Sequence, residues 1–351
     1  MLISGKNKRS LSPTHNAVYR KIIDCQSQRS YQWEDISKMN GGLRVRRISI
    51  SIIVLVVILL CILLLSSCSL ALESKMKALL QKAYNLKPGY SVGDKDFYHI
   101  ETIYLEMDEA GKVAQTIALD GCFSREVKSI EKGTRTDNFL WKCVKRGSSK
   151  GKKEINEYKI LPFTKGFQYT FGEWKPRRFP VDLSLIPKTM EGWRFVVKLI
   201  DAHTFDVIVN SDSYEEKLVH VGDSARLPGE GMPIAMDFPP LFTDTCFKNA
   251  PFSITFRGVT LHRDEPCAIL AFRSDDCRVH LVVNMNNMKL PIDGVSYYFG
   301  EVLLSLEDRK IVWGKIIERV DSMTSLPTLG TPMRQVIRRE ITLERMDRVE
   351  Y

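Results

Sequence analysis

One serine stands in a pattern that hydrolases use to hold a nucleophile. Residues 147–151 read Gly-Ser-Ser-Lys-Gly and match the G-x-S-x-G turn, whose central serine would be Ser149. That turn needs an apolar strand before it and a helix after it to hold the strained backbone. Four basic residues flank the segment here, and no helix signal follows. We therefore expect no catalytic residue at Ser149, and no other convergent set indicates an enzyme.

A second group has the side chains of a zinc site. His262, Cys267, Cys277 and His280 fall within nineteen residues. Their spacing is not that of a standard zinc finger. Cys277 and His280 differ by three positions on a predicted strand, so their side chains point to opposite faces of the sheet. The sequence therefore predicts half-buried strand residues and no metal, and it indicates no cofactor. The acidic pairs elsewhere coincide with predicted turns, where Asp and Glu are explained by turn chemistry.

Two cysteines could form a disulfide. Cys122 and Cys143 lie in neighbouring predicted strands, and a bridge between them is allowed if this part of the chain is exported. A bridge between Cys267 and Cys277 is less favoured, because the predicted turn at 273–276 pairs Cys277 with Phe272. Five cysteines follow residue 68, an odd number that leaves at least one free thiol.

The elements that would position these residues are mainly strands. A short amphipathic helix is predicted over 73–86, followed by strands at 97–107, 112–120, 125–130 and 139–145, with a turn at 108–111 and an exposed loop at 146–153. Residues 162–190 are irregular and contain four prolines. Residues 193–200 alternate apolar and polar side chains, which predicts a strand, extended by strands at 205–209 and 217–221. A second strand series covers 252–346, with turns at 273–276 and 307–310.

This pattern predicts a mainly β fold of antiparallel curled sheets, a half-barrel or a sandwich, with two similar halves as one option and one short N-terminal helix. The predicted organisation is a basic tail, a membrane segment, a linker with the helix, a first β half, a Pro/Gly-rich connection and a second β half. Their ranges are 1–47, 48–67, 68–89, 90–221, 222–251 and 252–351.

The eighteen residues 48–65 carry no charge, and three arginines precede them at 44, 46 and 47. A run of this length is at the threshold for crossing a bilayer, and the basic flank predicts that the chain after it is exported. Residues 1–47 hold ten Lys and Arg against three Asp and Glu, so seven of the nine net positive charges precede the run. The remaining chain is nearly neutral, which argues against nucleic acid as a partner.

At the end of the run, Leu65-Ser66-Ser67-Cys68 resembles the lipobox of bacterial lipoproteins. That resemblance implies cleavage before Cys68 and its lipidation, with Met39 as the start of a signal peptide. The alternative is an uncleaved single-pass helix, favoured by the length of the run. The exported part also resembles, by its anchor and strand content alone, the open half-barrel envelope lipoproteins that carry or chaperone lipids. Either way, the predicted location is the bacterial cell envelope, membrane-anchored, with residues after Cys68 outside the cytoplasm.

The leading expectation is a ligand-binding envelope lipoprotein, and a structural or interaction module is the alternative. The first is a non-enzymatic β domain that binds a hydrophobic or amphiphilic ligand within a curled sheet lined by aromatic residues. The second is a structural or protein-interaction module with a solid β-sandwich, whose aromatic residues fill the core. The aromatic residues in question are Phe97, Tyr98, Trp141, Phe167, Tyr169, Phe171, Trp193, Phe195, Tyr297, Tyr298, Phe299 and Trp313.

Overall fold

The chain divides into two compact units, Met1–Leu72 and Glu73–Tyr351, and the fold described here belongs to the second. The computed structural model describes residues 77, 81–131, 134–172, 181–210, 214, 216–227, 234–235, 237–285, 288–325 and 332–347. The predicted tail, apolar segment and lipidation site at Cys68 lie outside these residues, as does half of the predicted helix over 73–86. Among the described residues of that segment, 77 and 81 are helical and 82–86 are not, so the helix ends earlier than predicted. Within the described part, no helix combines the length and the apolar character needed to span a bilayer.

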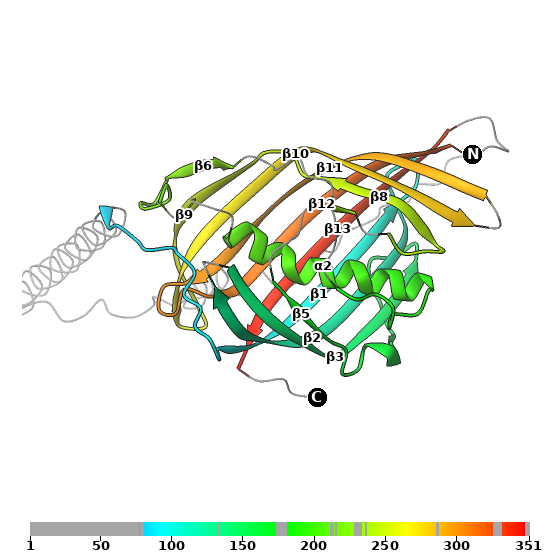
Figure 1. Ribbon diagram of the computed structural model, residues 1–351. Helices are drawn as coiled ribbons and strands as arrows, with labels where there is room; N and C mark the ends of the chain where they lie inside the picture. The colour runs from blue at the N-terminus through cyan, green and yellow to red at the C-terminus, as the bar shows by residue number, and fades with distance from the viewer. Residues whose placement is uncertain are drawn as a thin grey trace, which may run out of the picture. The chain divides into compact units, whose positions relative to one another are not determined.

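Thirteen described strands form one antiparallel sheet (Figure 1). In order along the sheet they run β4-β3-β2-β1-β13-β12-β11-β10-β8-β7, with β5 on β3, β9 on β10 and β6 on β9. The strands are β1 (Lys95–Met107), β2 (Val113–Glu131), β3 (Thr134–Lys150), β4 (Tyr158–Ile160), β5 (Gln168–Phe171), β6 (Ser224–Leu227), β7 (Ile234–Ala235), β8 (Phe242–Lys248), β9 (Phe252–His262), β10 (Glu265–Met285), β11 (Met288–Ser305), β12 (Ile311–Ser325) and β13 (Pro332–Met346). The other described elements are η1 (Pro162–Thr164) and α2 (Met190–Asn210).

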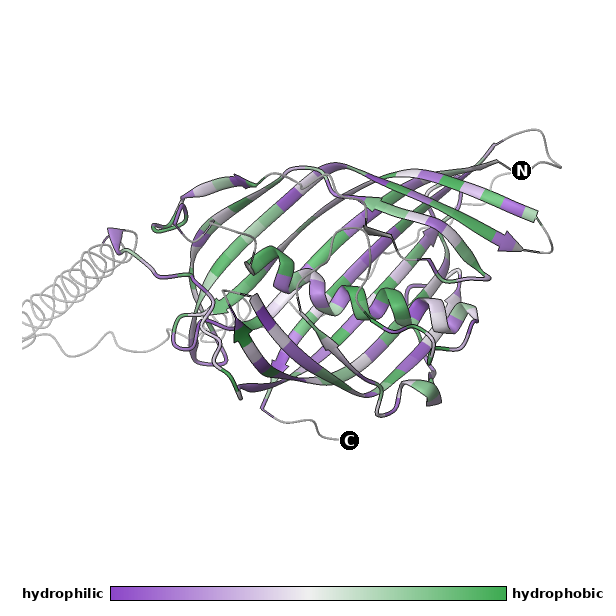
Figure 2. Cartoon of the chain, viewed as in Figure 1, coloured by the Kyte–Doolittle hydropathy of each residue, from purple (hydrophilic) through white to green (hydrophobic). Residues whose placement is uncertain are grey.

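The first and last long strands join the two strand series. β1 pairs with β13 from Phe97↔Met346 to Met107↔Val336, so both series belong to one continuous sheet. The strand order is a path with two ends, so the described strands do not close the sheet. Polar and apolar residues alternate along the strands, as expected when one face of a sheet is buried (Figure 2). The prediction of a mainly β fold with an antiparallel curled sheet is confirmed.

The strand predicted at 193–200 is wrong, because this segment is the first half of α2. Thr189 caps the helix: its Oγ1 accepts from the Gly192 amide at 3.2 Å, and its carbonyl accepts from the Trp193 amide at 2.9 Å. Over a longer window the buried apolar residues follow helical spacing, at positions 195, 196, 199, 202, 205 and 209. The eight residues 193–200 fit both the two-residue period of a strand and the 3.6-residue period of a helix. The helical period becomes clear only over the 21 residues of α2.

Other local predictions have mixed outcomes. The strands predicted at 205–209 and 217–221 are wrong, since the first is helical and the second is irregular. The turn predicted at 273–276 is wrong, because β10 runs through it with a bulge between Ser274 and Cys277. The turns at 108–111 and 307–310 are confirmed. The predicted loop at 146–153 is partly strand, because β3 continues to Lys150.

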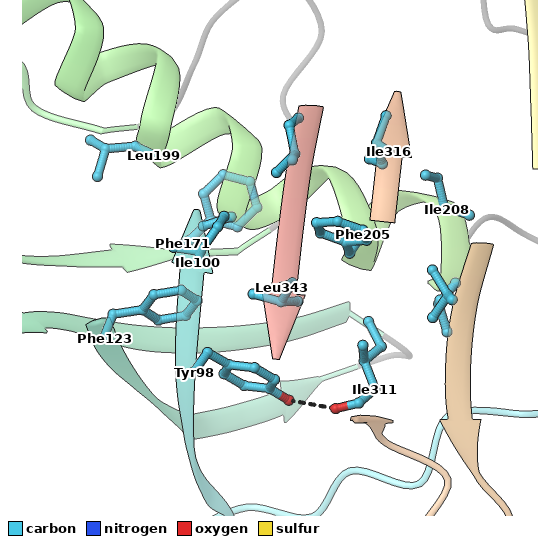
Figure 3. Close-up of a cluster of buried hydrophobic side chains, with 14 of the residues drawn as sticks. Tyr98, Ile100, Phe123, Phe171, Leu199, Phe205, Ile208, Ile311, Ile316 and Leu343 are labelled. Carbon is cyan, nitrogen blue, oxygen red and sulfur yellow. Dashed lines mark hydrogen bonds between the residues drawn. The ribbon is translucent and has the colours of Figure 1, made fainter. Parts of the chain in front are cut away.

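The helix lies against the concave face of the sheet, where it crosses several strands (Figure 1). Phe205 packs on β12 at Gly314, where a Cβ would lie 2.5 Å from the phenyl Cε1, so only glycine leaves room for the ring. Around this contact, Ile316 and Leu343 contribute apolar side chains to the same buried cluster (Figure 3). Ile341 belongs to that cluster as well. Helix and sheet therefore share one hydrophobic core.

Candidate functional site

Four titratable side chains on α2 are buried against the sheet: Lys198, Asp201, His203 and Asp206. Charged groups leave water only at a large cost unless they are paired and hydrogen-bonded. Their partners come from β1, β2, β3, β5 and β13, and together they form two ionic clusters and one aromatic site. Buried groups with perturbed pKa values are common at functional sites.

The first cluster is centred on Asp206. Arg125 Nη1 donates to both carboxylate oxygens at 2.8 and 2.7 Å, and Arg135 Nη2 lies 3.3 Å from Oδ1. Arg135 Nε also pairs with Asp137 at 2.8 Å, and Arg125 Nη2 donates to the Tyr98 hydroxyl at 3.1 Å. Burial would raise the pKa of Asp206, but the two arginines outweigh it and hold that pKa below its usual value. At Asp137 burial dominates and raises the pKa to about 6.

The second cluster joins Lys198 and Asp201 to the sheet through Thr102. Lys198 Nζ donates to the Leu119 carbonyl at 2.7 Å and to Thr102 Oγ1 at 3.0 Å, and Thr102 Oγ1 donates to Asp201 Oδ2 at 2.8 Å. Arg339 Nη1 donates to Asp201 Oδ1 at 2.9 Å. Burial lowers the pKa of Lys198 to about 7 against the pull of Asp201, and it raises the pKa of Asp201.

His203 lies between aromatic rings. Its imidazole stacks on Phe171 with ring centroids 3.6 Å apart and meets Phe139 edge-on at 4.5 Å. Its Nε2 lies 2.9 Å from the Tyr169 hydroxyl. Burial lowers the pKa of His203 to about 3, so the ring is neutral at pH 7.

These groups hold the helix on the sheet. The side chains that could act as nucleophile or base, Lys198 and His203, are 0% and 1% exposed, and each has partners from the sheet. A reaction needs a substrate within hydrogen-bonding reach of such a group, and in this structure the sheet covers both side chains. Neither cluster was predicted from the sequence, because their members are separated by up to 138 residues. The sequence signal that could have indicated these clusters is the presence of Lys198, Asp201 and Asp206 within the otherwise apolar segment 193–209.

The residues singled out from the sequence do not converge. Ser149 lies in β3 and its Oγ donates to the Lys152 carbonyl at 2.9 Å, with no helix following, so the hydrolase turn is not formed. His262 lies on β9, while Cys267 and Cys277 are buried on β10. His280 bonds to Asp293 at 2.7 Å. The described ranges contain no group of three or more residues arranged to hold a metal ion.

Cys122 and Cys143 face each other across β2 and β3. Both are half-buried, and all five described cysteines are thiols in this structure. Burial, followed by the nearby Asp120 carboxylate, raises the pKa of Cys122 to about 11, so its thiol is not activated as a nucleophile. The predicted disulfide between the two cysteines stays a prediction at this point.

The aromatic residues divide between the two faces of the sheet. Trp141 meets Phe195 with ring centroids 5.6 Å apart, and Trp193 stacks on Phe242 at 4.4 Å, so these rings join helix to sheet. Tyr297 and Phe299 alternate with the core-packed Tyr298 and are 37% and 47% exposed. The sequence placed the twelve aromatic residues mostly in the core, with some as candidates to line a cavity; six of them belong to the core, and Tyr297 and Phe299 lie on the outer face. The core group is Tyr98, Trp141, Phe167, Tyr169, Phe171 and Phe195.

Neither known protein families nor curated proteins give a match to this chain. Among solved structures, a Bacteroides fragilis protein described as exported, with a YmcC-like fold, is 9% identical over 74% of this chain and 100% of its own, with a TM-score of 0.19. A DUF1329 family protein from Desulfovibrio piger is 8% identical over 73% and 88%, with a TM-score of 0.17. A porin mutant from Rh. blastica is 8% identical over 72% and 99%, with a TM-score of 0.15. TM-scores this low do not establish a shared fold, and they identify no family.

Proposed function

We propose that this protein is a membrane-anchored component of the bacterial cell envelope whose β domain is a non-enzymatic interaction module. The observation that carries the proposal is the position of α2, whose side chains occupy the concave face of the sheet. A curled sheet that carries a lipid needs a cavity on that face. Here ionic clusters and aromatic contacts fasten the helix there, so the surface and the loops become the places for function.

The location rests on the sequence. The uncharged run at 48–65, its arginine flank and the lipobox-like end at Cys68 support an anchor with the β domain on the far side of the membrane. The nearly neutral charge of the rest of the chain supports a partner other than a polyanion.

We propose a protein as the partner, contacted through the outer face of β11–β13. This surface, the outer patch, consists of Tyr297, Phe299, Arg319, Arg338 and Met323, and the side chains of the two arginines are 46% and 45% exposed. Exposed Tyr, Phe, Met and Arg are enriched where protein interfaces bury their energetic centre. Acidic residues lie beside the arginines, with Asp321 near Arg319 and Glu340 near Arg338, which suits a mixed protein surface.

Crosslinking followed by affinity purification of the full chain tests this function. We expect a stoichiometric protein partner that is lost in Y297S/F299S and kept in L261S, a matched control because Leu261 is 70% exposed on the distant β9. Native mass spectrometry of the purified protein is the second measurement. Lipid bound at one molecule per chain, with no protein partner, would refute the interaction module and support the amphiphilic-ligand function instead.

A further inference from the structure

The register of the sheet places two of the described cysteines directly opposite each other on neighbouring strands. Cys122 lies directly opposite Cys143 in the β2–β3 ladder. The other three described cysteines face different residues, with Cys246 opposite His280, Cys267 opposite Ser305 and Cys277 opposite Ser296. Within the part of the chain that the structure describes, this is the pair that the backbone presents for a cross-link.

A bulge in β3 puts the two thiols on the same face. Cys122 pairs with Cys143, but its neighbour Phe123 pairs with Trp141, so Lys142 is the extra residue. Phe123 and Trp141 both point into the core. Without the extra residue, Cys143 would share the inner face with Trp141, because side chains two apart on a regular strand point the same way. The bulge reverses this alternation and turns Cys143 outward, as bulges do when they re-aim a side chain.

The burial pattern on both sides of the bulge agrees with this orientation. Val144, which follows Cys143, is 0% exposed and points inward. A Cβ on the inward-facing Gly121, which precedes Cys122, would lie 3.0 Å from the Val144 methyl group. Cys122 and Cys143 are both half-buried, as expected for neighbours on the outer face.

The backbone spacing suits a disulfide without rearrangement. Residues directly opposite each other in antiparallel strands have Cα atoms about 4.5–5.5 Å apart. Disulfides join cysteines whose Cα atoms are about 4.4–6.8 Å apart. The Cα spacing typical of such an opposed pair therefore lies within the range that disulfides span.

We propose that Cys122 and Cys143 form an intramolecular disulfide that links β2 to β3 across the outer face of the sheet. The proposal rests on the proposed function in one respect, since the bond persists only in an oxidising compartment outside the cytoplasm. The oxidant is an external disulfide. It accepts two electrons and two protons from the two cysteine thiols and becomes two thiols, while the S–S bond between Cys122 and Cys143 forms. This bond fixes the bulge, and with it the register that directs Phe123 and Arg125 into the core.

The test uses the full chain purified in detergent and equilibrated with oxidised glutathione at pH 8, followed by alkylation and peptide mass spectrometry. We expect one disulfide-linked peptide pair that contains residues 122 and 143. It should be absent in C122S and in C143S, present in the matched control C246S, and reversed by a dithiol reductant. Circular dichroism of each variant shows whether it is folded.

Two results would overturn the pairing: both thiols alkylated in folded, oxidised protein, or glutathione attached to each cysteine separately. A second measurement uses cells that are quenched with acid and alkylated before lysis, and it reports whether Cys122 and Cys143 are thiols or a disulfide in the cell. A chain that forms the disulfide when purified but carries both thiols in cells refutes the disulfide as a feature of the native protein. A chain that fails to form it when purified refutes the pairing alone, and protease accessibility in intact cells then tests the location.

Discussion

Protonation of His203 is expected to destabilise the domain in acid. The pKa of this histidine is about 3 in the folded chain, against about 6.5 when unfolded. Between these values the unfolded state binds one more proton than the folded state, so the free energy of unfolding rises with pH and falls as the pH is lowered. With about 1.36 kcal/mol per pKa unit, the loss is about 2 kcal/mol between pH 7 and pH 5 and about 3 kcal/mol by pH 4.

Asp137 opposes this effect. Its pKa is raised to about 6, so between its unfolded value and pH 6 the folded state binds the extra proton, and its contribution to stability falls as the pH rises. The pH dependence of the unmodified protein therefore combines opposite slopes. The difference between this protein and H203Q isolates the histidine, because Asp137 is present in both.

Urea unfolding followed by tryptophan fluorescence at several pH values between 4 and 7 measures this difference. At pH 7 we expect H203Q to be less stable, because it loses the stacking on Phe171. Toward pH 4 its deficit should shrink by about 3 kcal/mol and can change sign. H280Q, a matched change at a histidine whose side chain is 41% exposed, controls for the general loss of a histidine. A deficit in H203Q that stays constant across this pH range would refute the reasoning.

Three further changes test the packing of α2 by the same unfolding assay. G314A should cost about 1–3 kcal/mol, because the new Cβ would lie 2.5 Å from Phe205 Cε1; an unchanged midpoint would contradict this contact. D206A should cost about 3–5 kcal/mol, because it removes the carboxylate that Arg125 donates to and leaves the buried guanidinium with only the carboxylates of Asp96 and Asp137, at 3.7 and 3.9 Å; R125M/D206L should recover part of the loss. Lys198, with a pKa of about 7 in the folded chain, binds a proton more readily when unfolded, so stability should rise between pH 7 and pH 10 and K198M should lack that rise.

Disulfide formation also has a stability consequence. The loop between Cys122 and Cys143 is about as long as those for which chain entropy predicts about 3 kcal/mol of stabilisation. Oxidised protein should therefore unfold at higher urea than reduced protein, and C246S should show the same difference. Equal midpoints for the oxidised and reduced forms would show that the bond does not constrain the unfolded chain.

The sequence by itself determined the properties that depend on local pattern. Alternation and turn residues determined the mainly β class, and Asp108 and Gly111 marked a turn that the structure confirms. The distribution of charge around residues 48–65 determined the predicted orientation of the chain. Each of these depends on residues that are neighbours in the chain, so one sequence contains the relevant information.

The tertiary structure decided what depends on distant partners. Residues 193–200 alternate as a strand would, yet they belong to α2, whose buried residues pack against the sheet, as Phe205 does at Gly314. In the sequence alone, Lys198 and Asp206 look like charges that face solvent. In the fold, β1, β2 and β3 supply the hydrogen-bond and ion-pair partners that offset the cost of burying them. The bulge at Lys142 is invisible in the sequence, because a single extra residue shows only when two strands are aligned. That alignment alone decides whether Cys122 and Cys143 share a face.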